Sequence, residues 1–377
     1  MSPQLTYGDI YKAETKTLDL VEATESTQDF NLQMNARWSY GGLSYKHNDF
    51  NFSLFHECVI DGYVNIPNQM FELITEGNIK FRDASVDINP SAIFQSHHKW
   101  SIGVDYFLDK LMVGIQLNTY MGNAYLNTQS SKLSINFEEH FFEFGFDKDI
   151  DVKSSGAINY VGVDQVNLTL DDNALSPLGS LKNLGFGISA QFSYKPNESF
   201  RVFGRLDDLG AIRWNNQTEI LTDRSYSEFG GLDIKQSYVT GETYSVVDTL
   251  YSKIDIEKQT SAFFSPVLHS LFVGFDYRLN DFVSVGALAR NRNNGVSQQF
   301  FVEPKLTINP FENFNFTLAN VSHRNTLLNP KLEVHAELGN SFGFNLVLVN
   351  PWKFGRYYDA KMLHASLRMY VKLFPED

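Results

Sequence analysis

The sequence contains a single cysteine, Cys58, among 377 residues. One thiol excludes a disulfide framework and any zinc site built from cysteines. Positive charge is also scarce: 31 Lys and Arg stand against 44 Asp and Glu, which gives a formal net charge of −13. Nucleic-acid-binding proteins usually carry basic patches, so we expect no nucleic-acid partner. No stretch approaches about 18 consecutive apolar residues, which excludes a transmembrane helix.

The first residues also lack a targeting signal. Residues 1–11 (MSPQLTYGDIY) contain no basic region followed by an apolar stretch, as a secretory signal peptide would. Taken alone, this favours a cytosolic protein; the alternatives are a mature chain or a native start upstream of Met1. We therefore regard residues 1–29 as an N-terminal extension and expect residues 30–377 to form the folded body.

The sequence is rich in apolar residues, and these recur at every second position. Hydrophobic residues make up 43% of the chain, which excludes disorder. Within 184–194 the apolar positions alternate with Gly, Ser and Gln, so one face of a strand would be apolar and the other small and polar. The same alternation marks the following segments: 30–40, 100–107, 111–118, 270–278, 283–290, 331–338 and 366–373.

The length of these segments and the rhythm of their connections favour a membrane barrel over a soluble sandwich. The segments run to about ten residues, which is what a tilted strand needs to cross a bilayer, whereas strands in globular proteins average about 5–6. Short turns alternate with long connections, of which the longest are 61–96, 147–180 and 210–266. We therefore predict an all-β, antiparallel transmembrane β-barrel of the bacterial outer membrane, with short periplasmic turns and long extracellular loops.

The expected number of strands is about 14, with 16 as the alternative, because bacterial single-chain barrels have even numbers. We identify about fifteen segments, and the loop rhythm makes 30–46 a descending strand that an ascending strand should precede. Residues 13–28 are polar and rich in Thr and Glu, so either one segment is over-split or the native chain begins upstream of Met1. Asn68–Glu76, which follows Pro67, breaks the alternation and predicts a short helix.

Two stretches resemble a known family. The first is 67–81 (PNQMFELITEGNIKF) followed by 100–135, and the second is 184–214, which ends in Asp208-Leu209-Gly210-x-Ile212-x-Trp214. From about residue 30 onward the chain resembles uncharacterised outer-membrane barrels of Bacteroidota, which are distantly similar to long-chain fatty-acid transporters and to the shuttle barrel of type nine secretion. Members of that family have a signal peptide and a further N-terminal segment. The resemblance implies a fold and a location rather than an activity.

The most specific part of this resemblance predicts a turn. We expect Asp208 to end a strand, Gly210 to permit a turn with positive φ, and Trp214 to lie in a membrane-interface girdle. A binding role for Asp208 and Arg213 is the alternative.

Two motifs match catalytic or metal-binding patterns, but the strand structure around them argues against such a site. Gly339-Asn340-Ser341-Phe342-Gly343 matches G-x-S-x-G, but a second strand follows where a nucleophile elbow needs a helix, so we predict a hairpin turn and no catalysis. His97 and His98 are adjacent, so they would point to opposite faces of a strand, and we assign no metal to them. No cofactor is predicted.

An acidic run is the weak candidate for a metal site. Asp147, Asp149 and Asp151 resemble the start of a calcium loop, but Val152 replaces the Gly and Ile158 the Glu that an EF-hand needs. An irregular Ca²⁺ site, helped by Asp171 and Asp172, remains as an alternative to a solvated acidic face.

Charges on the polar phase of the strands should face the barrel interior. We expect them to form internal ion-pair networks or, alternatively, to line an open pore. The candidates are Arg37, Asp105, Arg201, Arg205, Asp207, Asp276, Arg278, Arg290, Glu303, Lys305, Glu333, Glu337, Arg368 and Lys372. Apolar residues on the same phase, which a tunnel for hydrophobic solutes would need, are scattered: Phe107, Met112, Phe203, Phe272 and Leu288.

Our leading functional hypothesis is a non-enzymatic scaffold or partner subunit of an envelope secretion or assembly machine. The partners would be outer-membrane lipid and proteins that dock on the long extracellular loops, where Tyr160, Trp214, Tyr226 and Tyr244 suit an interface. The alternatives are a transporter of hydrophobic small molecules, a diffusion porin, and an outer-membrane hydrolase that uses Ser341.

Overall fold

The structure is a computed structural model that describes most of the chain. The described residues are 11–12, 17–18, 30–76, 81, 83–128, 131–137, 143–162, 165–168, 181–230, 255–293, 298–311, 313–323, 329–338, 342–351 and 364–371. Twenty strands form one large antiparallel sheet, and one helix, α3 (Asn68–Glu76), lies within these ranges. The all-β antiparallel fold is therefore confirmed, and α3 has the bounds that the sequence predicts.

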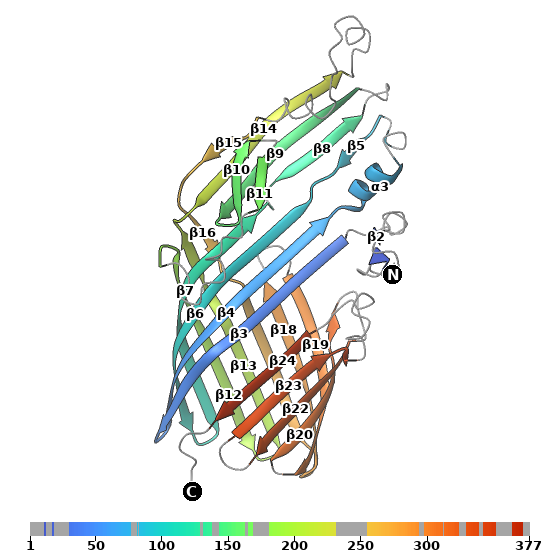
Figure 1. The fold of residues 1–377 in the computed structure, drawn as a ribbon. Helices are drawn as coiled ribbons and strands as arrows, with labels where there is room; N and C mark the ends of the chain where they lie inside the picture. The colour runs from blue at the N-terminus through green and yellow to red at the C-terminus, as the bar shows by residue number, and fades with distance from the viewer. Residues whose placement is uncertain are drawn as a thin grey trace, which may run out of the picture.

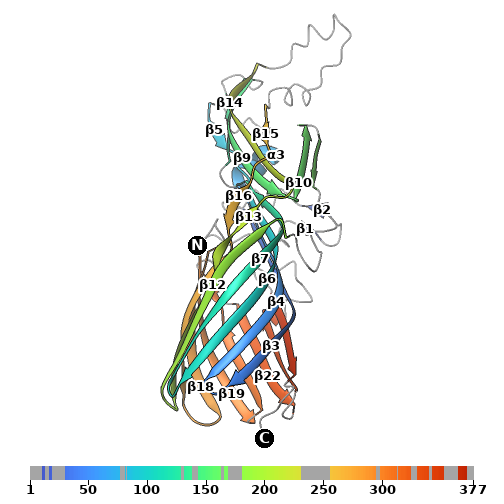
Figure 2. The same ribbon diagram turned by 90° about the vertical axis from the view of Figure 1, so that its left-hand side faces the viewer.

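Thirteen long strands follow one another in a ladder that curves into a barrel-like wall (Figure 1, Figure 2). They are β3 (Phe30–His47), β4 (Phe50–Ile66), β6 (Ser91–Leu108), β7 (Leu111–Asn127), β12 (Leu184–Asn197), β13 (Phe200–Trp214), β17 (His269–Arg278), β18 (Val283–Asn293), β19 (Gln298–Phe311), β20 (Phe314–Asn320), β22 (Pro330–Leu338), β23 (Phe342–Val349) and β24 (His364–Val371). A short strand, β21 (Ser322–His323), continues β20 along β19. Within the described residues, the wall thus has one strand fewer than the fourteen that we expected.

The wall forms because alternate residues of each strand point to opposite faces. On three adjacent strands, Ile102 pairs with Leu117, which pairs with Ile188, and all three side chains are exposed on the outer face. The residues next to them in the chain, such as Ser101, Asn118 and Ser189, are buried on the inner face. This arrangement is the apolar-outside, polar-inside alternation that the sequence predicts for a barrel wall.

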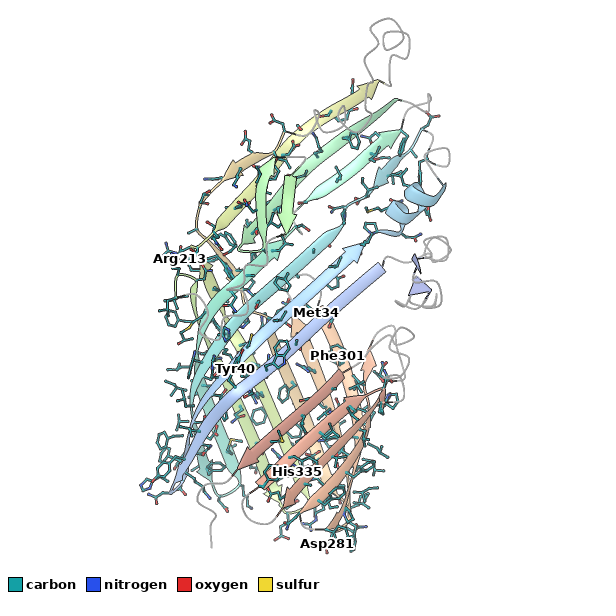
Figure 3. The ribbon with its side chains drawn as sticks, viewed as in Figure 1. Met34, Tyr40, Arg213, Asp281, Phe301 and His335 are labelled. Carbon is teal, nitrogen blue, oxygen red and sulfur yellow. The ribbon has the colours of Figure 1, made fainter. Side chains whose placement is uncertain are left out.

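The two ends of the wall differ in their connections. At the lower end in Figure 1, short turns join β3 to β4, β6 to β7, and β12 to β13. Asp281, in the turn between β17 and β18, marks this end in Figure 3. The long connections lie at the upper end, as expected from the alternation of short and long segments.

The long connections differ from the predicted loops because they fold together. The strands involved are β5 (Ser85–Asp87), β8 (Lys132–Phe137), β9 (Glu143–Ser155), β14 (Thr218–Gly230) and β15 (Glu257–Gln259), and we call them the upper sheet. Thirteen residue pairs join β9 to β14, although these strands come from two different connections. Leu126 of β7 pairs with Ser154 of β9, so the upper sheet continues the wall upward (Figure 2). Much of 61–96, 147–180 and 210–266 is therefore strand rather than loop.

A small apolar core stabilises the upper sheet near α3. Phe81, Val86, Ile135 and Phe137 are buried together, and Leu73 of α3 packs against them. Alternation in the flanking segments supplies one apolar face to the sheet, and the amphipathic helix covers part of it. Within the described residues, no helix is long and apolar enough to cross a membrane.

Five short strands complete the described structure. β1 (Tyr11–Lys12) and β2 (Thr17–Leu18) pair with each other, as do β10 (Ile158–Gly162) and β11 (Gln165–Leu168). β16 (Phe263–Pro266) pairs with the upper end of β13, on the side where β17 pairs with its lower part.

Candidate functional site

The interior site begins at an irregularity in β13. Ile188 pairs with Leu209 but Ala190 pairs with Leu206, so two residues of β13 face Ser189 alone. This is a β-bulge, and Asp208 adopts a φ of 61° there. The bulge shifts the phase of the strand, so the consecutive carboxylates of Asp207 and Asp208 both face inward. The backbone N–H of Asp208 donates to Ser189 Oγ at 3.0 Å, which anchors the bulge.

Asp208 lies at the centre of a mostly buried polar cluster, in which the Arg37 side chain is 42% exposed. Lys99 Nζ lies 3.2 Å from Asp208 Oδ1 and 3.0 Å from Glu57 Oε2. Arg37 approaches both carboxylates at 3.7 Å. Asn118 Nδ2 and the Tyr120 hydroxyl each donate to Asp208 Oδ1 at 3.3 Å. We call these six residues the Asp208 network: Arg37, Glu57, Lys99, Asn118, Tyr120 and Asp208.

The Asp208 network combines two anions with two cations, so it is electrically neutral. Such pairing matters because an unpaired buried charge costs several kcal/mol. The hydrogen bonds from Asn118 and Tyr120 satisfy further lone pairs of the Asp208 carboxylate, which a buried ion pair needs in order to be tolerated. The cluster is thus a closed arrangement of charges within the interior.

The network joins strands that are not neighbours in the wall. β6, which carries Lys99, is separated from β13 by β7 and β12. A second contact reaches farther: Arg292 on β18 forms an ion pair with Asp61 on β4, six strands away along the ladder. Asn35 also donates to the Asp61 carboxylate. At this level, opposite walls therefore meet through their side chains.

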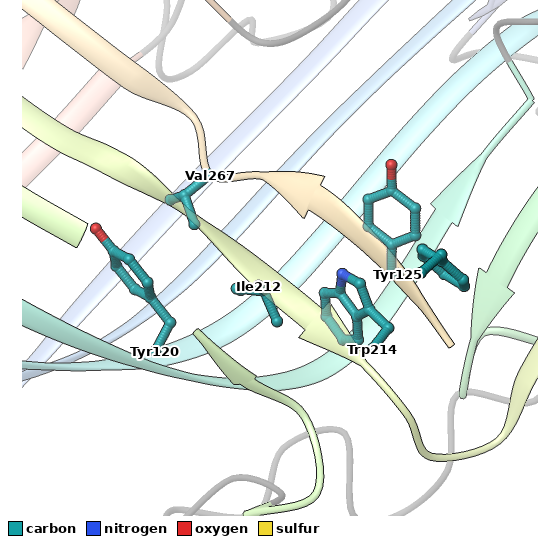
Figure 4. Packing of buried hydrophobic residues seen from close by; sticks show 6 residues of the cluster. Tyr120, Tyr125, Ile212, Trp214 and Val267 are labelled. Atoms are coloured by element: carbon teal, nitrogen blue, oxygen red, sulfur yellow. The ribbon is translucent and has the colours of Figure 1, made fainter. Parts of the chain in front are cut away.

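An aromatic cluster lies next to the network at the upper end (Figure 4). Tyr120, Tyr125, Ile212 and Trp214 are buried together with residues of β16 and the segment after it. Trp214 Nε1 donates to Ser265 Oγ at 2.8 Å, and the Trp214 ring stacks 5.3 Å from Tyr125. The prediction of a membrane-interface girdle is wrong for Trp214, because the bulge at Asp208 turns this side chain inward.

The structure also corrects the predicted turn at Gly210. β13 continues to Trp214, and the positive φ belongs to Asp208 rather than to Gly210. Gly210 serves close packing instead: a Cβ there would lie 2.3 Å from the carbonyl oxygen of Phe186. Arg213 is exposed on the outer flank of the wall, where its guanidinium lies 6.0 Å from the Phe264 ring (Figure 3).

Several of the other predicted interior charges form pairs nearer the lower end. Gln191 donates to Asp105 at 2.7 Å, and Arg205 pairs with Asp207. Arg201 donates to Ser193 at 2.9 Å. Lys305 pairs with Asp276 at 2.7 Å.

The remaining predicted charges follow the later strands. Lys331 joins Glu303 at 2.7 Å and Glu333 at 3.4 Å, and Glu337 lies 3.9 Å from His335. Arg278 pairs with Asp281 in an exposed turn, so this pair does not line the interior. Arg290 on β18 pairs in register with Phe301, and Arg368 on β24 with Asn345. Lys372 lies outside the described residues.

The predicted metal candidates are not brought together. Asp147, Asp149 and Asp151 lie on one face of strand β9, where successive members are about 6.6 Å apart along the strand. Arg224 neutralises Asp149 at 3.2 Å. In the ranges that the structure describes, no group of three or more His, Cys, Asp or Glu side chains could hold a metal ion. Asp171 and Asp172 lie outside these ranges.

His97 and His98 point to opposite faces, as expected for neighbours in a strand. His97 packs edge-on against the Tyr120 ring inside the wall, whereas His98 Nδ1 lies 3.2 Å from His56 Nε2 on the outer side. Residues 339–341 of the G-x-S-x-G motif lie outside the described residues, and the flanking strands β22 and β23 pair as an antiparallel hairpin.

Sequence reasoning missed most of the charges that bridge the walls. Glu57, Asp61, Lys99 and Arg292 were not among the predicted interior charges, although Lys99 lies in phase with Asp105. The missing signal is three-dimensional, because charges from distant strands become partners only when the sheet curls. A comparison of in-phase charges across all strands would have identified Lys99.

Fold and interior together define an antiparallel β-barrel-like protein in which side chains from distant strands are in contact near the upper end. The chain belongs to a family of unknown function (DUF5723), whose model matches residues 2–328. No curated protein matches the sequence.

The chain is also similar to solved structures. One is the toluene transporter TodX of Pseudomonas putida, with 7% identity and a TM-score of 0.36, covering 92% of this chain and 90% of that one. Another is the ferric enterobactin receptor PfeA of Pseudomonas aeruginosa, in a Q482A mutant bound to enterobactin, with 9% identity and a TM-score of 0.25. The second similarity covers 85% of this chain but only 53% of the receptor.

Proposed function

We propose that the protein is a non-enzymatic β-barrel of the bacterial outer membrane that presents the upper sheet as a docking surface for a protein partner. Support for the membrane location comes from the outer face of the wall. Ile102, Leu117 and Phe186 lie on three adjacent strands and are 66%, 63% and 68% exposed. Contiguous apolar surface of this kind is unfavourable in water, at about 25 cal/mol per Å², and is favourable against lipid.

The observation that carries the docking role is the ladder between β9 and β14. Two separate connections use thirteen residue pairs to form a rigid surface above the wall. A preformed surface loses little conformational freedom on binding, which favours association with a protein. Tyr226 is exposed on this surface, and tyrosine is a frequent interface residue. A scaffold or partner subunit of an envelope secretion or assembly machine would use the surface in this way.

The interior favours a scaffold over a porin or a tunnel for hydrophobic solutes. The Asp61–Arg292 pair and the Asp208 network bridge opposite walls at the upper end. Nearer the lower end, the inward ring of Phe203 lies 5.1 Å from the Arg201 guanidinium and 5.2 Å from Lys305 Nζ. Cations over an inward aromatic ring are unsuited to a continuous apolar path.

Two measurements test the proposal. In planar bilayers, the purified full chain should show no steady ion conductance, and porin-like conductance would contradict a closed interior. In native membranes, Tyr226→Ser should reduce recovery of co-purifying protein several-fold. The control Tyr277→Ser, at an exposed tyrosine on the outer face of the wall, should leave recovery unchanged. A native protein that is isolated alone as a monomer would contradict the docking role.

A further inference from the structure

The two edge strands of the wall, β3 and β24, differ from every strand between them. Each strand between them is paired on both sides, whereas among the described residues no ladder joins β24 to β3 (Figure 1). The exposure of β3 agrees with an open side. Trp38 and Leu43 on its outer face are 54% and 65% exposed, and Ser39 and Ser44 are exposed as well. In the fully paired strand β12, by contrast, the inward residues Ser189 and Ser193 are buried.

Strand direction decides what can close this seam. Twelve antiparallel pairings lead from β3 to β24 around the wall. Each pairing reverses direction, so an even number leaves β3 and β24 running in the same direction. Direct closure would therefore need a parallel pair in a sheet that is otherwise antiparallel. One additional strand that runs antiparallel to both would close the wall at fourteen.

The bilayer makes this additional strand energetically important. In hydrocarbon, each unpaired backbone N–H or C=O group costs several kcal/mol, and for this reason barrels in membranes have no open edge. β3 is 18 residues long and therefore offers a long row of such groups. This step rests on the proposed membrane location, because water would satisfy the same groups.

We propose that the seam between β3 and β24 binds one extended strand of a partner polypeptide. The strand runs from the lower to the upper end, antiparallel to both edges. It spans about ten residues, with apolar side chains outward, level with Trp38 and Leu43, and polar side chains facing the interior. Backbone hydrogen bonds on both sides supply the affinity, and the alternating side chains supply the specificity.

Other occupants fit the seam less well. A second copy in the same membrane orientation offers only edges that run the same way as β3 and β24, so it cannot pair with either of them in an antiparallel manner. Within residues 1–29, no ten-residue stretch has apolar side chains at every second position. Tyr11–Lys12 already pairs with Thr17–Leu18. A partner polypeptide therefore fits the edges better than either.

The first experiment measures the spacing across the seam. In a full chain with Cys58→Ser, cysteines replace the inward residues of β3 one at a time, each together with Ser366→Cys on β24. An intervening strand separates the two edges by about 10 Å, too far for a disulfide, so no pair should cross-link in native membranes. Ser44→Cys with Ser53→Cys, which are neighbours across the β3–β4 ladder, is the positive control and should cross-link. Disulfides between β3 and β24 would overturn the proposal.

The second experiment identifies the occupant. A benzophenone amino acid replaces Met34 or Leu43, near the two ends of β3, and the cross-linked peptides are mapped in the native host. Both positions should label one segment of another polypeptide, with Met34 linked to its C-terminal side and Leu43 to its N-terminal side. The same probe at Phe186, on the paired strand β12, should label lipid only. Adducts with any other segment of the same polypeptide, adducts with lipid alone, or a parallel order would each overturn the proposal.

The two proposals fail in different ways. Loss of the protein from the outer-membrane fraction would remove the membrane location on which the seam depends. A negative result for Tyr226→Ser would remove the docking role of the upper sheet and leave the cross-linking at β3 unaffected.

Discussion

Two buried Lys–Asp pairs, one inside the wall and one in the upper sheet, have similar geometry but join different kinds of strand pair. Lys99 and Asp208 lie 3.2 Å apart, with side chains 6% and 4% exposed. Lys148 and Asp223 lie 3.1 Å apart, with side chains 4% and 1% exposed. The first pair joins β6 to β13, which are not adjacent, whereas the second joins β9 to β14, which already share thirteen residue pairs. Similar contacts therefore maintain a long-range shape in one region and reinforce a local ladder in the other.

The partners of each pair sharpen this difference. Lys99 is shared between two carboxylates, because Glu57 also lies 3.0 Å from its ammonium group. Asp223 accepts two further hydrogen bonds, from the Ser225 hydroxyl and the backbone N–H of Asp255, as Asp208 does from Asn118 and Tyr120. Loss of the lysine should therefore affect two buried carboxylates in the wall and one in the upper sheet.

The largest effect should come from Lys99→Met. This change leaves Asp208 and Glu57 buried with only Arg37, at 3.7 Å, to balance them. Removal of one partner of a buried ion pair costs about 3–5 kcal/mol, so the free energy of unfolding should fall by that amount. Urea unfolding of the full chain in lipid vesicles, followed by tryptophan fluorescence, measures it. A loss below about 1 kcal/mol would show that the Asp208 network does not hold the walls together.

Arg292→Met should have the next largest effect. Asp61 then keeps the hydrogen bond from Asn35 but loses the cation from the opposite wall. We expect a loss of about 2–3 kcal/mol in the free energy of unfolding, because the carboxylate stays buried. We also expect ion conductance in planar bilayers above the wild-type baseline.

Lys305→Met is the control for this conductance. It removes the partner of Asp276, which lies only two strands away along the ladder, and should therefore leave the conductance at the wild-type baseline. Equal conductance from both variants would show that the Asp61–Arg292 pair does not close the interior.

Lys148→Met should act locally. Asp223 keeps its two hydrogen bonds and the β9–β14 ladder stays in place, so we expect a loss of about 1.5–2 kcal/mol, confined to the upper sheet. Hydrogen exchange should show faster exchange of the β9 and β14 amides and unchanged protection in β6 and β12. Faster exchange throughout the wall would contradict the separation of the two regions.

The sequence predicts the wall well because each strand carries its own signal. Alternation at 184–194 is a local property, and the structure shows β12 there with its apolar residues outward. The bulge at Asp208 has no such local signal, since it arises from the register between β12 and β13. That single shift reverses the phase of every later residue of β13, and for this reason the predictions for Gly210 and Trp214 were wrong.

The interior site and the upper sheet depend even more on distant contacts. Arg292 and Asp61 lie 231 residues apart in the chain, so only the curvature of the sheet makes them partners. β9 and β14 alternate weakly and come from two connections, and their length suggested loops. Local patterns thus predict the strands, whereas pairing between distant segments determines the site.

The smallest effect should come from Arg224→Ala, which tests whether burial accounts for the strength of the two buried Lys–Asp pairs. Arg224 Nε lies 3.2 Å from Asp149 in the β9–β14 ladder, close to the spacing of the Lys148–Asp223 pair, but its side chain is 72% exposed and that of Asp149 52%. Exposed ion pairs are screened by water and contribute about 0–1 kcal/mol, so the free energy of unfolding should change by less than about 0.5 kcal/mol. Urea unfolding beside Lys148→Met measures the contrast between two ion pairs on opposite faces of the same ladder. If Arg224→Ala destabilised the chain as much as Lys148→Met, short distance alone, rather than exclusion of water, would account for the strength of these pairs.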